Sequence, residues 1–136
     1  MRSLLITLAI ALSGCANMPL NPYTDLSNAG KYRQALHAID VAQTLQTAKY
    51  PGCFYESFPV TRKIIGKQPS KQSVILWGVT TSYFSAQLDH YIYKSDLSES
   101  WKDFLGYVMV GVTADTIIKN YGIGIRIGAK PAKCNW

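Results

Sequence analysis

A chain of 136 residues with a formal net charge of +6 is long enough to form one small domain and no more. Its two histidines and three cysteines form no cluster with metal-ligand spacing, and no phosphate-binding glycine loop occurs, so we expect neither a metal centre nor a cofactor.

The chain begins with a segment typical of an exported protein. Met1 and Arg2 supply a short basic start, and residues 4–12 (LLITLAIAL) form an apolar run. A membrane-spanning helix needs about 20 apolar residues, so this run has the length of a signal-peptide core instead. An ordinary secretory signal ends in small residues of the A-x-A type, but this run ends in a cysteine-containing tetrad.

The tetrad Leu12-Ser13-Gly14-Cys15 resembles the lipobox of bacterial lipoproteins, in which a leucine and two small residues precede an invariant cysteine. In that class the cysteine thiol is coupled to diacylglycerol, the signal is cut before it, and the new N-terminus is acylated. The resemblance therefore implies a signal peptide at residues 1–14 and lipidation of Cys15. Several acyl chains anchor a protein stably without a transmembrane helix.

The residues after Cys15 bear on location and on domain organisation. An Asp directly after the lipidated cysteine retains enteric lipoproteins in the inner membrane, but here Ala16 and Asn17 follow. The resemblance thus implies the outer membrane, facing the periplasm, while the inner membrane and the cell surface stay open. Residues 15–30 hold prolines and asparagines without apolar periodicity, which predicts a lipidated N-terminus and tether before a single globular domain at 31–136.

The first half of that domain mixes clear and unclear signals. Residues 31–49 place apolar side chains at three- and four-residue steps, which predicts an amphipathic helix that Pro51-Gly52 ends as a turn. Residues 53–66 are mixed and indicate a short strand pair or an irregular crossing, with Pro59 against a long strand. Residues 72–93 admit helix or strand, and their apolar spacing favours a helix from about 70 to 93.

The second half predicts a helix followed by a strand. Residues 101–120 form an apolar helix, and residues 104–114 are apolar nearly all round, as in helices buried in a core or in lipid. The run is too short to span a membrane, so we expect core. Residues 122–128 (GIGIRIG) alternate as a strand does. The expected fold class is α+β, mainly α: one small domain of about three helices with a short strand pair that includes the C-terminal GIGIRIG strand.

Two cysteines remain once Cys15 is lipidated. Cys53 and Cys134 lie in a chain expected in an oxidising compartment, so we predict one disulfide between them. Two buried free thiols are the alternative.

One further family resemblance concerns small lipoproteins of the YceK/YidQ type. These pair a lipobox with a YPG element and, further on, a hydrophobic stretch carrying a V-x-D-T-like motif. This chain has Tyr50-Pro51-Gly52 and, at residues 112–116, VTADT. The characteristic Asp-Leu-Pro and the proline-rich end of that family are absent, and the family has no assigned activity.

The candidates for catalysis are few. His37 and Asp40 lie three residues apart on the first helix and share one face, whereas the adjacent Asp89 and His90 point about a third of a turn apart. Asp115, in the apolar helix, is expected to be a hydrogen-bonded structural carboxylate. We therefore predict no catalytic residue and a non-enzymatic binding or structural module. A small periplasmic hydrolase built on His37 or His90 is the alternative.

Basic residues gather in two stretches, and each has few acidic neighbours. The first holds Arg62, Lys63, Lys67 and Lys71, and the second holds Lys119, Arg126, Lys130 and Lys133. They suit anionic headgroups, to which each basic residue near a membrane adds about 1 kcal/mol. They equally suit anionic envelope polymers, or serve as a solvated face. The expected partners are the membrane and an envelope protein or polymer, not nucleic acid, and the oligomeric state stays open.

Overall fold

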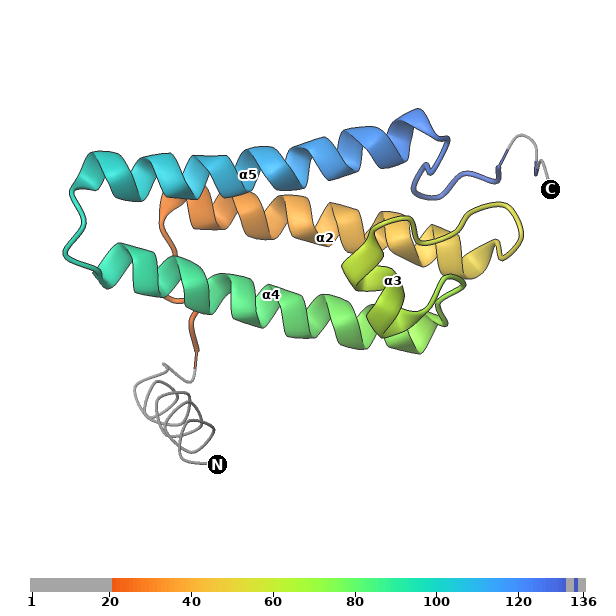
Figure 1. The fold of residues 1–136 in the computed structure, drawn as a ribbon, viewed down its shortest axis with the longest axis horizontal. Coiled ribbons are helices and arrows are strands. Elements are labelled where there is room, and N and C mark those ends of the chain that lie inside the picture. The colour runs from red at the N-terminus through yellow and green to blue at the C-terminus, as the bar shows by residue number, and fades with distance from the viewer. Residues whose placement is uncertain (1–20, 132–133, 135–136) are drawn as a thin grey trace, which may run out of the picture.

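The computed structural model describes residues 21–131 and residue 134. Its elements, in chain order, are the helices α2 (Asn28–Lys49), α3 (Pro59–Ile65), α4 (Lys71–Lys94) and α5 (Glu99–Gly122). The three long helices lie side by side, with α4 running opposite to α2 and α5 (Figure 1).

Local chemistry explains where these helices begin and end. The Ser27 hydroxyl caps α2 by accepting the backbone N–H of Gly30 at 2.9 Å. Ser70 and Ser73 form a reciprocal capping box at the start of α4. Residues 72–93 therefore continue a well-capped helix, as their apolar spacing predicts. Pro51-Gly52 follows α2 as expected, with Gly52 at a φ of +89° that favours glycine.

The expected strand pair is wrong, because the structure is all-α over the residues it describes. Residues 53–66 contain α3 and only an isolated bridge between Pro51 and Phe54. The GIGIRIG segment folds back on the end of α5: the backbone N–H of Ile125 donates to the Asn120 carbonyl at 3.0 Å. Gly124 and Gly128 take positive φ angles of 91° and 78°, which no regular strand contains. The glycines of this segment therefore form turns, and the Ile125 side chain between them is buried.

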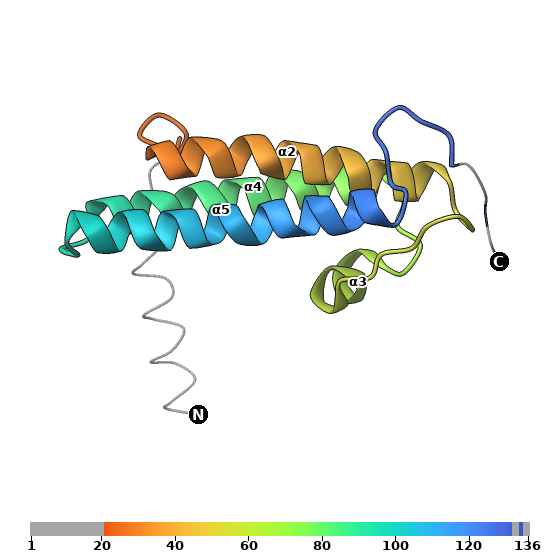
Figure 2. The ribbon, with the colours of Figure 1, turned by 90° about the horizontal axis from the view of Figure 1, so that it is seen from above.

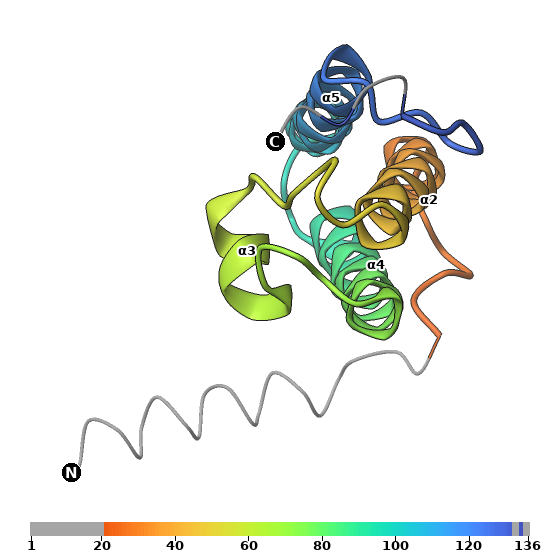
Figure 3. The same ribbon diagram turned by 90° about the vertical axis from the view of Figure 1, so that its right-hand side faces the viewer.

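The arrangement places α2 against both of the other long helices. Viewed along the bundle, α2, α4 and α5 occupy the corners of a triangle, and α3 lies beside α4 away from α2 (Figure 3). From above, α3 stands apart from the three-helix layer (Figure 2). α2 packs closely on both α4 and α5, while α4 and α5 approach each other less closely. Among the helices, α3 contacts α4.

Small residues set the spacing of these helices. A Cβ built on Gly106 of α5 would lie 2.7 Å from the Cβ of Ala29 on α2. A Cβ built on Gly78 of α4 would lie 2.8 Å from a methyl of Val41. Gly30 faces the Asp89 carboxylate, whose Oδ1 would lie 2.7 Å from a Cβ at that position. At these three positions a side chain of the neighbouring helix therefore lies directly against the backbone of a glycine, an approach that a Cβ would prevent.

This close packing leaves large apolar side chains outside. The buried polar residues are Arg33, Gln43, Thr47, Gln87 and Asp89, whereas Phe104, Val108 and Val112 of α5 are 57%, 45% and 64% exposed. The expectation that residues 104–114 form the core is thus wrong, since only Gly106 of α5 is buried. Among the helices that the structure describes, none is both long and apolar enough to cross a membrane.

Candidate functional site

A cavity of about 310 Å³ lies beneath α3, between the three long helices and the turn at Ile125. Its size falls within the range of small-molecule sites. Its polar lining includes His37, Asp40, Thr44, Glu56, Thr81 and Asn120. α2, α4 and α5 each contribute to it, and the segment before α3 closes it.

Asp40 belongs to a hydrogen-bond network that joins α2 to α5. The Asn120 amide donates to Asp40 Oδ1 and to Gln43 Oε1, each at 3.2 Å, and the Gln43 amide donates to the Ile117 carbonyl at 3.3 Å. Burial raises the pKa of Asp40 above its ordinary value, while nearby His37 and the Asn120 amide act in the opposite direction. This carboxyl is therefore harder to ionise than an exposed one.

Glu56 brings a second carboxyl to the cavity. The Glu56 backbone N–H donates to the Lys67 carbonyl, and its carboxylate accepts the Phe58 N–H, each at 2.9 Å. Burial raises the pKa of Glu56, and the negative charge of Asp40 raises it further. The structure therefore couples two carboxyls from α2 and from the segment before α3. The charge of Asp40 thus disfavours ionisation of Glu56.

His37 is held on the same side of α2 as Asp40. Its Nε2 lies 3.1 Å from the Gly78 carbonyl oxygen and 3.0 Å from Thr81 Oγ1. A carbonyl oxygen only accepts, so Nε2 carries the proton in this arrangement. Thr81 Oγ1 in turn donates to the Trp77 carbonyl at 2.8 Å. The imidazole nitrogen nearest this hydroxyl is thus a donor, not a base that would take the hydroxyl proton.

The structure separates the other predicted candidates from this cavity. His90 does not line it, and the His90 Nδ1 is buried without a hydrogen-bond partner among the described residues. Asp115 lies exposed on α5, where its carboxylate accepts a hydrogen bond from the Lys119 ammonium at 2.5 Å. Asp89 is buried elsewhere in the bundle.

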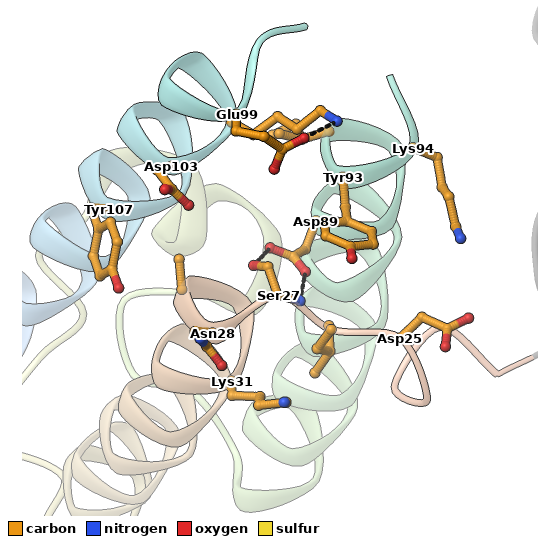
Figure 4. A pocket seen from close by; sticks show the side chains of 14 residues that line it. Asp25, Ser27, Asn28, Lys31, Asp89, Tyr93, Lys94, Glu99, Asp103 and Tyr107 are labelled. Atoms are coloured by element: carbon orange, nitrogen blue, oxygen red, sulfur yellow. Dashed lines mark hydrogen bonds and ion pairs between the residues drawn. The ribbon is translucent and has the colours of Figure 1, made fainter. Parts of the chain in front are cut away.

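Asp89 lines a second cavity, of about 550 Å³, where α2 begins and α4 ends (Figure 4). Asp89 accepts the Ser27 backbone N–H at 2.9 Å and the Ser27 hydroxyl at 2.7 Å. The buried Arg33 guanidinium donates to the Ser85 carbonyl. Burial lowers its pKa, while the charge of Asp89 opposes that change. These contacts cap α2 and compensate a buried cation, so we assign this cavity a structural role.

A disulfide between Cys53 and Cys134, with their Cα atoms 4.5 Å apart, agrees with the sequence prediction. It ties the C-terminal segment to the turn after α2. Cys15 and the expected signal peptide at residues 1–14 lie outside the described residues, so lipidation stays a prediction. The described residues contain no group of three or more His, Cys, Asp or Glu side chains arranged to hold a metal.

Sequence reasoning found Asp40 and His37 but missed Glu56, Gln43 and Asn120. Glu56 sits in the segment that we expected to be a strand pair. A usable signal existed on α2, where Arg33, Asp40, Gln43 and Thr47 recur at helical spacing on one side, and three of these are among the buried residues. Comparison of the chain with family models, with curated protein sequences and with solved structures gives no match.

Proposed function

We propose that the chain is a bacterial cell-envelope lipoprotein anchored through Cys15, and that its domain is a non-enzymatic binding module. The cavity beneath α3 carries this proposal, because Asp40, Glu56 and Asn120 converge in it. Carboxyl and amide oxygens accept hydrogen bonds, so the cavity suits a small group that donates several of them. An amine or a guanidinium, free or on an envelope protein, has that chemistry.

The lipobox-like tetrad supports the anchor. Replacing Cys15 by serine removes the only thiol that could be lipidated at that position. We expect the Cys15→Ser chain to remain an unprocessed precursor and to leave the membrane fraction. A Ser variant that is matured and still fractionates with membranes would show that the lipoprotein assignment is wrong.

The binding role is tested with agmatine, which carries both an amine and a guanidinium. A ligand that binds only the folded state raises its melting temperature. Agmatine should therefore raise the melting temperature of the full chain and have no such effect on the Asp40→Asn/Glu56→Gln variant. The matched control is Asp103→Asn, an exposed carboxyl outside the cavity, which should respond as the parent does. An equal response of all three proteins would contradict the proposal.

A hydrolase built on His37 or His90 is the second candidate, and the contact between His37 and the Thr81 hydroxyl is what favours it. The proton on Nε2 argues against it, as does the 2.8 Å bond from Thr81 to the Trp77 carbonyl. Alanine at both histidines tests the hydrolase. The binding role predicts that the cellular phenotype survives His90→Ala entirely and His37→Ala at least in part, because His37 lines the cavity, whereas a hydrolase that uses either histidine would lose its activity with that histidine.

A further inference from the structure

The outer surface of α4 and α5 consists largely of exposed apolar side chains. We define this outer surface by Leu76, Val79 and Phe84 of α4 and by Phe104, Val112 and Ile118 of α5, which are 57–70% exposed. Scattered single apolar residues on a surface need no explanation, but a contiguous group marks an interaction site. The cavity beneath α3 does not account for them, since none of the six lines it.

We propose that this outer surface docks on a lipid bilayer, with α4 and α5 sunk into the headgroup region and α2 facing water. The proposal rests on the proposed function in one respect, which is that the Cys15 anchor brings the domain to the membrane.

The spread of the apolar side chains favours lipid over a protein partner. A helix turns by about 100° per residue, so Val79 and Phe84 point about 140° apart, and Val112 and Ile118 about 120° apart. One flat protein interface does not cover side chains that diverge so widely on two helices. Fluid acyl chains do, because an amphipathic helix sinks about 5–10 Å into the boundary between headgroups and acyl chains.

The interior of the bundle points the same way. In water, helices associate by burying their large apolar side chains, whereas helices in lipid associate through small residues and interhelical polar contacts. Here the contacts between helices use Ala29, Gly30, Gly78 and Gly106, with Arg33 and Asp89 buried among them. Helix contacts of this kind are typical of helices whose outer surface faces lipid.

Basic side chains lie at the ends of these helices. Lys71 and Lys94 bound α4, whereas Lys119 near the end of α5 is paired with the exposed Asp115, which lies between Val112 and Ile118 along the helix. Arg62 and Lys63 lie on the exposed α3 at the same end as Lys71. Long basic side chains reach past apolar surface to the headgroups, where anionic lipid attracts them. The exposed residues of α2 include Lys31 and two alanines, Ala35 and Ala38, and fewer large apolar side chains, of which Tyr32 and Ile39 are 61% and 40% exposed.

Single introduced cysteines test the proposal in isolated membranes. With Cys15 lipidated and Cys53 bonded to Cys134, the parent chain holds no free thiol, so a water-soluble maleimide should not label it. Val112→Cys on the outer surface should then react at least tenfold more slowly than Ala38→Cys on α2. Labelling in SDS gives the full signal for each variant.

Two results would overturn the proposal. Equal labelling rates would show that the outer surface is open to water. A second overturning result is slow labelling of Val112→Cys together with its oxidation to a disulfide-linked dimer. If the dimer persists when extra lipid is added to dilute the protein in the membrane, a second copy of the chain covers the outer surface. Labelling of the parent chain would instead count against lipidation of Cys15, provided that the same chain labelled after reduction shows the Cys53–Cys134 thiols as additional signal, so failure of the anchor and failure of the docking surface are told apart.

Discussion

The inside of this bundle holds charged side chains beside small apolar ones, and its outside carries many large apolar side chains. Inside, Arg33 and Asp89 are 5% and 3% exposed, while outside, Leu76 and Ile118 are 70% and 69% exposed. Charged residues are almost never fully buried unless they have polar partners, and here Asp89 accepts both Ser27 donors while Arg33 donates to the Ser85 carbonyl. The inner polar contacts therefore hold the helices together, whereas the outer apolar side chains are available for binding.

The largest effect is expected from Asp89→Ala. The change leaves the Arg33 guanidinium buried without its compensating charge and removes the acceptor of both Ser27 donors. Each donor left without an acceptor costs about 1–3 kcal/mol in free energy of unfolding, and the uncompensated Arg33 charge adds to this loss; urea denaturation measures it. Asp103→Ala, an exposed carboxyl near the same cavity, is the control and should change little. Equal stability of the two variants would break the comparison.

Loss of the disulfide comes next. Cys53→Ala frees the C-terminal segment, and removal of a native bridge from a small domain costs about 2–5 kcal/mol. Thermal unfolding should show the same decrease for Cys134→Ala and for the double variant. A double variant clearly less stable than either single variant would show that the two sulfurs act separately.

Glycine substitutions on α5 sharpen the contrast on one helix. Gly106→Ala forces a methyl to within 2.7 Å of Ala29, and overpacking of this kind costs about 1–3 kcal/mol. Gly111 has open space around it, so Gly111→Ala should stabilise the helix by about 0.5–1 kcal/mol. Chemical denaturation of both variants measures the difference. Changes of the same sign would contradict close packing at Gly106.

The cavity predicts a dependence of stability on pH. Burial raises the pKa of Asp40 above its ordinary value of 3.8, so the folded state binds a proton that the unfolded state releases. The stability of the fold should therefore decline as the pH rises from the ordinary pKa through the raised one, and Glu56 acts in the same direction. Asp40→Asn should flatten this decline in urea denaturation measured from about pH 3 to about pH 7. A steeper decline in the variant would refute the assignment.

The smallest effect on folding is expected from a substitution on the outer surface of the bundle. Val112→Ser changes a side chain that is 64% exposed, and such surface substitutions usually alter stability in solution by less than about 0.5 kcal/mol. Urea denaturation without lipid checks this value. A loss as large as that of Gly106→Ala would mean that Val112 belongs to the core.

The sequence predicted the long helices because their signals are local. Strong helix formers at residues 31–49 and serine caps before α4 act within a few residues of each other. The strand predicted for GIGIRIG is wrong. Its prediction used the alternation of apolar side chains, whereas the backbone at Gly124 and Gly128 takes turn conformations. The chain does not reveal locally that Ile125 donates back to Asn120 instead of pairing with a strand.

Only part of the candidate site could be predicted from the sequence. His37 and Asp40 share a helix face at a spacing that can be counted, but Glu56 joins them only through tertiary folding of the segment before α3. The apolar helix 104–114 presented a choice between core and lipid. Apolarity alone does not decide it, because the small residues at the helix contacts determine which side faces inward.

Trp101 offers the most direct measurement of the claim that the outer surface meets lipid. It lies 58% exposed on α5, with its ring 5.6 Å from that of Phe104. With Trp77→Phe and Trp136→Phe, the fluorescence of the anchored protein reports on Trp101 alone. Vesicles with brominated acyl chains should quench this emission strongly, and aqueous iodide should quench it weakly. Strong quenching by iodide with none by brominated lipid would contradict the account.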